Sequence, residues 1–170
     1  LIMAILISPM IVPLIITAAG MFFFYARINL VYSFTGIILA HVALATPFVV
    51  ITVTATLVGF DMNMVKASQS LGAKPLRTFF KIIMPLILPG VISGALFAFI
   101  TSFDEVVIVM FMASLDQLTI PKQMWAGIRQ EISPVILCMA TCLVVLSIFL
   151  LTTVELLRRR SEKLRGITAR

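Results

Sequence analysis

Two adjacent acids, Asp104 and Glu105, stand between long stretches without charge. Positions 82–103 before them and 106–115 after them contain no Asp, Glu, Lys or Arg. A carboxylate within a bilayer is costly, and it usually faces the bundle interior or an aqueous cavity. Two carboxylates beside a path would attract a cation by Coulomb interaction at low dielectric constant. The pair therefore predicts a path for a cationic substrate. The alternative is a pair that caps or pins a helix near the outer membrane interface.

Few other side chains could do chemistry. His41 is the single histidine, and Cys138 and Cys142 lie four positions apart in one apolar stretch. His41 could relay protons or bind a ligand, but a hydrogen bond inside the helical bundle is the simpler interpretation. The two thiols have no His or carboxylate beside them, which makes a poor metal site, so we interpret them as packing residues. We expect no metal and no cofactor.

A membrane enzyme is the second class of function considered. Adjacent helical residues point about 100° apart, which suits a shared catalytic pair poorly, and no Ser–His–acid set assembles around one histidine. The motifs GxxxxGK[ST], GxGxxG and HExxH are absent from the sequence. We therefore predict no catalytic residue and no ATP site, and the driving energy must come from a gradient or from another subunit.

Long apolar helices must position these residues. Hydrophobic residues make up 61% of the chain and charged residues 12%, whereas about a quarter of an ordinary soluble domain is charged. A bilayer core takes roughly 20 helical residues, and four uncharged runs are long enough: 1–26, 28–60, 82–103 and 132–154. The spans expected from these runs are about 5–25, 34–58, from 89 onward, and 134–156. We predict an all-α polytopic membrane protein with one transmembrane domain over residues 1–170. The apolar start without Met indicates a chain that lacks its N-terminal part.

The depth of the acid pair follows from the third span. Asp104 lies 15 residues after Pro89, or roughly 22 Å along a helix that rises 1.5 Å per residue. This distance is about two-thirds of a hydrocarbon core about 30 Å thick.

The basic residues are distributed unevenly along the chain. Segment 59–81 and the tail 157–170 together carry ten Lys and Arg residues, and the other two connections carry three. With four spans, the two richer segments fall on one side, and the positive-inside rule places that side in the cytoplasm. The net charge of +6 therefore indicates topology, and we expect no nucleic-acid partner.

The segment 61–84 predicts a bent pair of short helices, which we call the coupling elbow. Asp61 is suited to the N-cap of a helix over 62–71, and Gly72 to a left-handed residue after it. Pro75 is suited to the first position of a second helix, over 76–84. Pro85, Pro89 and Gly90 predict a turn into the next span. A helix lying on anionic lipid is the alternative, but it explains only the charge and the amphipathicity.

The elbow resembles the cytoplasmic "EAA" loop of the permease subunits of ABC importers. The matching positions are Ala67, Leu71, Gly72, Ala73, Phe79, Ile82, Pro85, Pro89, Gly90 and Gly94. The resemblance implies a type I ABC importer permease-like helical bundle in the bacterial cytoplasmic (inner) membrane. It also implies a separate ATPase subunit that receives the loop, an extracytoplasmic substrate-binding protein, and a second permease subunit, the same or related. The implied ATPase-coupling residues are Lys66, Ala67, Ser68, Leu71, Gly72, Ala73, Phe79 and Pro85.

The triplet departs from the family pattern at two positions. Lys66 stands where the family has Glu, and Ser68 occupies the third position. A charge reversal at Lys66 would disturb a salt bridge to the ATPase. Either the partner compensates, or docking here depends mainly on shape and on the bend at Gly72.

Two later stretches point to a substrate class. Ser102-Phe103-Asp104-Glu105 and the segment TIPKQMWAGIRQEISP are similar to permeases of the spermidine/putrescine subgroup. Polyamines are flexible cations, so Asp104 and Glu105 in the path suit them. The alternatives are another solute on the same scaffold, such as ferric iron or an opine or amino-acid-like compound, and a gradient-driven carrier or channel, which would leave the elbow unexplained.

Overall fold

The computed structural model describes residues 1–130 and 133–164, and the side chains of residues 1–129 and 133–156. The part of the chain described contains helices and connecting loops and no strand. The helices are α1 (Ile2–Ile11), α2 (Leu14–Arg27), α3 (Phe34–Val58), α4 (Asn63–Ser70), α5 (Pro75–Thr78), the π-helix η1 (Phe79–Ile83), α6 (Met84–Phe103), α7 (Val107–Met112), α8 (Ile120–Gln130) and α9 (Pro134–Leu164).

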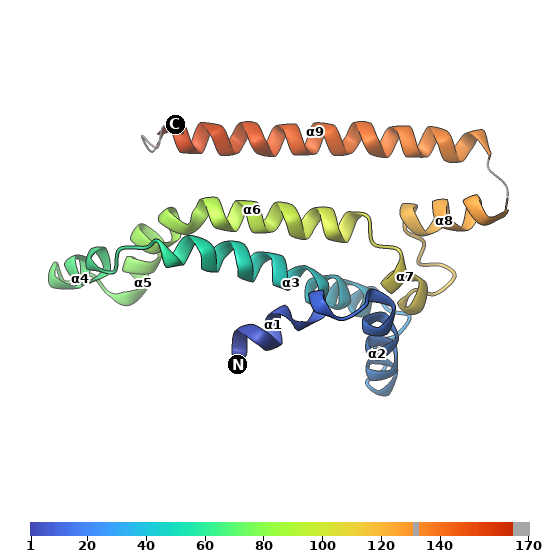
Figure 1. Ribbon diagram of the computed structural model, residues 1–170, viewed down its shortest axis with the longest axis horizontal. Helices are drawn as coiled ribbons and strands as arrows, with labels where there is room; N and C mark the ends of the chain where they lie inside the picture. The colour runs from blue at the N-terminus through green and yellow to red at the C-terminus, as the bar shows by residue number, and fades with distance from the viewer. Residues whose placement is uncertain (131–132, 165–170) are drawn as a thin grey trace.

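Three helical segments are long and apolar enough to cross a membrane. They are Phe34–Val58, Pro75–Phe103 and Pro134–Leu156. In Figure 1 these segments run along the long axis of the molecule, with the elbow formed by α4 and α5 at one end and α7 and α8 toward the other. Helix α9 ends near the elbow, so the beginning of the basic tail and the elbow lie at the same end.

The predicted first span, 5–25, is broken. Helices α1 and α2 meet at an angle of 113°, and together they make a fourth span only if the bent pair is counted as one. The break lies at Val12, whose backbone is extended (φ −75°, ψ 136°). Pro13 explains it, because proline disfavours helical geometry in the preceding residue and has no N–H to continue the helix. The predicted single span is thus two helices with a sharp break between them.

Helices α3 and α6 form the most extensive contact in the molecule. Gly90 and Gly94 of α6 are buried against α3. A β-carbon at Gly94 would lie 2.9 Å from the Cα atom of Val49, and one at Gly90 would lie 2.9 Å from the Thr52 carbonyl oxygen. Small residues four apart allow membrane helices to approach closely, so these glycines set the distance between the two spans.

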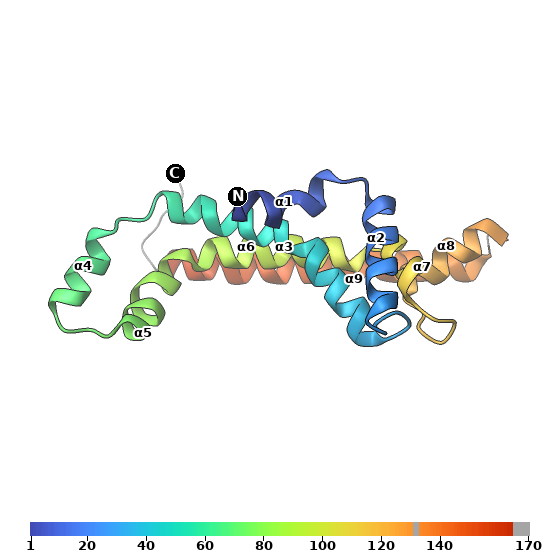
Figure 2. The same ribbon diagram turned by 90° about the horizontal axis from the view of Figure 1, so that it is seen from below.

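A small apolar core lies where α2, α3 and α7 meet. Its fully buried members are Ala18, Ala40, Ile108 and Met112. Helix α9 is different, since none of its described side chains is buried. Figure 2 shows α1 and α2 on the side of α3 that faces away from α9. The spans therefore form an open, layered bundle with large lipid-accessible or partner-accessible apolar faces.

The loops at the α7 end are joined by hydrogen bonds. The Tyr32 amide donates to the Met112 carbonyl at 2.9 Å, and Gln117 Nε2 donates to the Tyr32 carbonyl at 3.2 Å. Asn29 and Tyr32 both have positive φ, 54° and 61°. These bonds hold the α2–α3 connection against the start of the α7–α8 connection.

Candidate functional site: the coupling elbow and the acid pair

The first arm of the elbow is α4, one residue shorter at each end than the predicted 62–71. The Asn63 amide donates to Asp61 Oδ1 at 2.9 Å, so the Asp61 carboxylate satisfies one of the free donors at the start of this helix. The prediction of Asp61 as the N-cap is wrong by one residue, because the N-cap is Met62. The Asp61 carboxylate still accepts a hydrogen bond from the first amide of the helix.

Gly72 forms the bend. Its φ is +78°, a region that residues with a β-carbon avoid. The Gly72 amide donates to the Gln69 carbonyl at 2.9 Å, and the Ala73 amide donates to the Ser68 carbonyl at 3.1 Å. These two bonds are the Schellman pattern that ends a helix at a left-handed residue. A β-carbon at Gly72 would meet nothing within 4 Å, so the requirement for glycine is conformational.

The second arm differs from the prediction of one helix over 76–84 followed by a turn. Pro75 begins α5, as predicted, but the chain then passes through the π-helix and continues into α6 without a turn at Pro85, Pro89 or Gly90. The Met84 amide donates to the Phe79 carbonyl, five residues back. Pro85 has no N–H, and its ring would crowd the carbonyl four residues before it. A wider π turn relieves that crowding.

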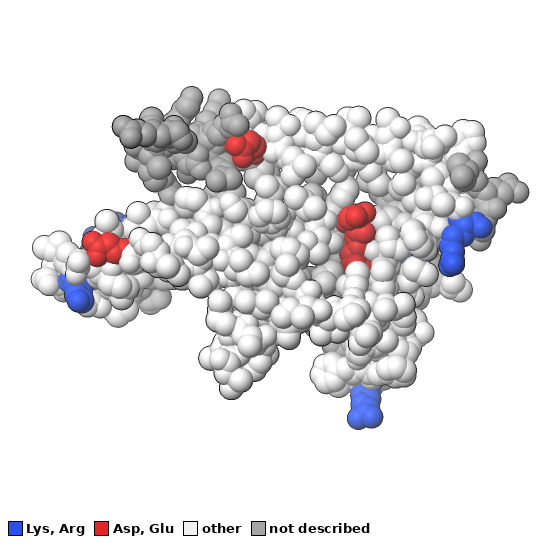
Figure 3. Space-filling view, in the orientation of Figure 1, with Lys and Arg blue, Asp and Glu red and all other residues white. Residues whose placement is uncertain are grey.

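The elbow presents apolar side chains beside basic ones. Leu71 is 89% exposed, Leu76 73% and Phe80 60%. Lys66, Lys74, Arg77 and Lys81 are exposed on the same short segment, and Figure 3 shows charged atoms at this end of the molecule. Among the predicted coupling residues, Ala67 and Gly72 are also exposed, Phe79 is 37% exposed, and Ala73 and Pro85 are half-buried. Ser68 is the exception, because only 5% of it is exposed.

The acid pair lies at the end of α6, and the two side chains have different surroundings. Asp104 follows the last residue of α6 and is exposed. Glu105 is 4% exposed, and its Oε1 accepts a hydrogen bond from the Ile108 amide in the first turn of α7. The capping role that the sequence left open as an alternative therefore describes Glu105. Asp104 has no such bond among those described.

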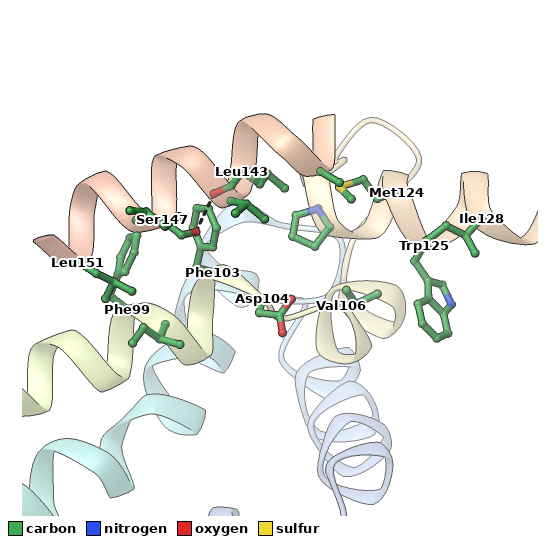
Figure 4. A pocket seen from close by; sticks show the side chains of 15 residues that line it. Phe99, Phe103, Asp104, Val106, Met124, Trp125, Ile128, Leu143, Ser147 and Leu151 are labelled. Atoms are coloured by element: carbon green, nitrogen blue, oxygen red, sulfur yellow. Dashed lines mark hydrogen bonds between the residues drawn. The ribbon is translucent and has the colours of Figure 1, made fainter. Parts of the chain in front are cut away.

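Asp104 borders two cavities. One, of about 570 Å³, lies between the end of α6 and helices α8 and α9, and Ala140, Leu143 and Ser147 line it. Figure 4 shows Asp104 at its edge, with Phe103 and Leu143 nearby. The second, also about 570 Å³, lies at the break between α1 and α2, where both Asp104 and Glu105 contribute to its wall. In Figure 3 one group of acidic atoms lies in the middle of this face, with uncharged atoms around it.

The cavity beside Asp104 extends along α9 from Ala140 to Leu151. Both residues belong to the apolar segment Pro134–Leu156, which is long enough to cross a membrane. Asp104 therefore borders a cavity that runs beside a candidate span.

His41 contacts a residue that the sequence did not single out as its partner. His41 Nδ1 and Ser102 Oγ are 2.8 Å apart and join α3 to α6. The other ring nitrogen, Nε2, is buried without a described partner. His41, Ser102 and Glu105 line one cavity of about 340 Å³. In the sequence, the one signal that could have identified Ser102 as a site residue is its position two residues before Asp104.

A family model decides the classification. The model for the binding-protein-dependent transport system inner membrane component matches residues 1–163. The chain belongs to this family. Both the elbow and the acid pair lie within the matched region.

The chain is similar to curated permease proteins of spermidine/putrescine and putrescine transport systems. It is 31% identical to the spermidine/putrescine transport system permease protein PotC of Haemophilus influenzae over 150 residues, which cover 88% of this chain and 58% of that protein. It is 30% identical to PotC of Escherichia coli K12 over 151 residues, or 89% and 57% of the two chains. The putrescine transport system permease protein PotI of E. coli K12 is 31% identical over 140 residues, or 79% and 50%. The chain thus spans about half the length of these relatives.

The predicted site residues of the chain fall in two separate places. The coupling residues gather at the elbow, and Asp104 and Glu105 lie at the other end of α6. Cys138 and Cys142 are exposed free thiols, and no group of three or more His, Cys, Asp and Glu side chains among the described residues could hold a metal. The side chains of the basic tail, 157–170, lie outside the described residues.

Proposed function

We propose that this chain is the membrane-spanning subunit of an ATP-driven ABC importer and forms part of the path for putrescine, spermidine or a related organic cation. The observation that carries the proposal is the elbow, a bend fixed at Gly72 that exposes apolar and basic side chains between two spans. Such a surface suits a protein partner with an apolar groove. Its position at the end of α6 suits transmission of movement to the acid pair at the other end.

The partners follow from the same proposal. A separate ATPase subunit binds the elbow at the cytoplasmic face and hydrolyses ATP, so this chain is not itself an enzyme. An extracytoplasmic binding protein delivers the substrate, and a second permease subunit completes the path. The three candidate spans and the bent pair support a location in the bacterial cytoplasmic (inner) membrane as a multi-pass protein.

The acid pair gives the path its preference for cations. The exposed Asp104 carboxylate is placed to meet an ammonium group in a cavity lined mainly by apolar side chains. Coulomb attraction is strong where water is scarce, and the apolar wall suits the methylene segments of a polyamine. Glu105, buried and bonded to α7, holds the end of α6 in place behind Asp104. Rigid-body movements of the spans would open the path to each side in turn.

The experiment is uptake of labelled putrescine and spermidine. Cells deficient in polyamine transport would receive the complete transport system to which this subunit belongs, with and without this subunit. We expect uptake that requires both the subunit and ATP. Co-purification with an ATPase but no polyamine uptake would retain the importer and exclude this substrate in favour of another, such as ferric iron or an opine or amino-acid-like compound. Uptake without any ATPase would contradict the importer and indicate a gradient-driven carrier or channel.

A further inference from the structure

Ser68 and Thr78 make a buried contact across the inside of the elbow. Ser68 lies in α4 and Thr78 ends α5, and their hydroxyl oxygens are 2.7 Å apart. Only 5% of Ser68 and 3% of Thr78 are exposed. Ser68 is the buried residue of α4, and Thr78 is the buried residue of α5. The centre of the elbow is therefore a pair of hydroxyl groups and not an apolar cluster.

The hydrogen bonds around this pair are mutually consistent. Thr78 Oγ1 lies 3.4 Å from the Lys74 carbonyl oxygen. A carbonyl oxygen has no proton to donate, so the Thr78 hydroxyl is the donor in this bond. Thr78 Oγ1 is then free to accept the proton of Ser68 Oγ. Loss of the Thr78 hydroxyl would leave the buried Ser68 hydroxyl without its acceptor, which costs more than the bond itself contributes. Loss of the Ser68 hydroxyl would leave Thr78 with the longer bond to the Lys74 carbonyl alone.

The pair closes the elbow on the side opposite the Gly72 turn. The two arms are also joined by the residues of the turn, by the backbone bonds around Gly72, and by packing of α4 against α5 and η1. The backbone bonds fix the end of α4. The bond between Ser68 and Thr78 adds a buried side-chain link between the arms away from the turn, and α5 continues through the π-helix into α6.

We propose that the bond between Ser68 and Thr78 is a latch that makes the coupling elbow one rigid body, so that movement of α4 reaches α6. Ser68 is then a positioning residue that does not contact the ATPase. This role explains why Ser68 is buried, although the resemblance to the family loop implies that it takes part in docking. The proposal rests on the proposed function, because it assigns a task to Ser68 within the coupling of ATP hydrolysis to transport.

The test measures substrate transported per ATP hydrolysed by the complete importer in vesicles. We expect Ser68→Ala and Thr78→Val each to lower this ratio by about fivefold or more, from the cost of an unsatisfied buried hydroxyl, while the ATPase still co-purifies. Ser68→Thr keeps a hydroxyl and should retain most of the ratio. The matched control is Ser70→Ala, because Ser70 is exposed on the same helix and its hydroxyl donates only to the Lys66 carbonyl.

Two results would overturn the latch. One is a Ser68→Ala ratio equal to that of Ser70→Ala. The other is an equal loss in Ser68→Ala and Ser68→Thr, which would indicate a packing contact without a role for the hydroxyl. If the single variants fail to accumulate, Ser68→Cys with Thr78→Cys, in a background with Cys138 and Cys142 replaced by Ser, provides a second test. Oxidation of the two introduced thiols to a disulfide should preserve coupling if α4 and α5 move together, as the latch requires. Loss of coupling on oxidation would show that the two arms must move apart, and would contradict the latch.

Failure of the latch and failure of the proposed function give different results. An importer whose wild-type form transports without ATP would contradict the proposed function before any variant is compared. An ATP-dependent wild type with fully coupled Ser68→Ala and Thr78→Val variants would contradict the latch alone.

Discussion

At the scale of single residues, Gly72 is the position where backbone geometry limits function most directly. Its φ of +78° strains any β-branched side chain, at a cost of order 1–3 kcal/mol. We expect Gly72→Val to abolish transport while the protein still inserts into the membrane, because the bend is outside the spans. Uptake assays with immunoblots of membrane fractions would measure both effects.

Gly59 provides the control for this substitution. It lies near the same end of the molecule and has φ −86°, and a β-carbon added there would meet nothing within 4 Å. Gly59→Val should therefore retain uptake. Normal uptake by Gly72→Val would count heavily against docking through the elbow.

The two acids predict different phenotypes because their surroundings differ. Asp104→Asn removes charge from an exposed position, so we expect weaker uptake of a polyvalent cation at normal protein abundance. The double variant Asp104→Asn with Glu105→Gln should be weaker still. A rise in the KM for spermidine larger than that for putrescine would be the kinetic signature, since spermidine carries more charge. Unchanged uptake by the double variant would show that the two acids have a structural role and do not attract the substrate.

Glu105 also predicts a stability effect that Asp104 does not. Glu105→Ala leaves the Ile108 amide, now bonded to Glu105 Oε1, buried without an acceptor, which costs about 1–3 kcal/mol. Glu105→Gln keeps an acceptor oxygen. We expect the alanine variant to accumulate less and to aggregate at lower temperature in detergent, and the glutamine variant to behave like wild type in both measurements. Equal stability of the two variants would exclude the capping role.

At the scale of elements, the close pairing of α3 with α6 depends on two glycines. A methyl group at Gly94 would lie 2.5 Å from Thr52 Oγ1 and 2.9 Å from the Cα atom of Val49. The backbone of α3 must move to admit it, and overpacking of this kind costs typically about 1–3 kcal/mol. We expect Gly94→Ala to lower the thermal stability of the detergent-solubilised permease. Gly20→Ala in α2 is the control, because a β-carbon there meets nothing within 4 Å.

The sequence predicts the apolar helices well and their irregularities poorly. Uncharged runs identify the spans α3, α6 and α9, and Gly72 and Pro75 locate the two ends of the elbow turn. The sequence did not predict that the chain breaks at Val12 or forms a π-helix before Pro85. A proline indicates that a helix is disturbed, but it does not reveal whether the helix bends, breaks or widens. The separation of α7 from α6 also escaped prediction, since residues 106–115 are as apolar as the span before them.

The candidate site shows the same limit. Asp104 and Glu105 are conspicuous as the only adjacent acids in an apolar region, but their sequence does not reveal that one is exposed and the other caps α7. Ser68 and Thr78 are ordinary hydroxyl residues in a polar segment, and only the folded elbow brings them together. Interactions between distant positions leave no periodic signal in a single sequence.

At the scale of the whole molecule, the arrangement of charge and the arrangement of helices support one orientation. The elbow and the last described turns of α9 lie at one end (Figure 1), and the elbow and the tail are the segments that hold ten of the 13 basic residues. Helix α8, with Trp125 half exposed, lies at the other end, where an aromatic side chain suits the headgroup region. Under the proposed function, the positive-inside rule predicts that the elbow lies in the cytoplasm and α8 outside.

Cysteine labelling tests this orientation, and with it the possibility of any cytoplasmic ATPase reaching the elbow. In a background with Cys138 and Cys142 replaced by Ser, Lys74→Cys marks the elbow and Gln123→Cys marks α8, and both positions are exposed. A membrane-impermeant maleimide should label Gln123→Cys in intact cells and Lys74→Cys only in inside-out vesicles. Labelling of Lys74→Cys in intact cells would place the elbow outside, where no ATP is available, and would remove the basis for coupling even if transport were observed.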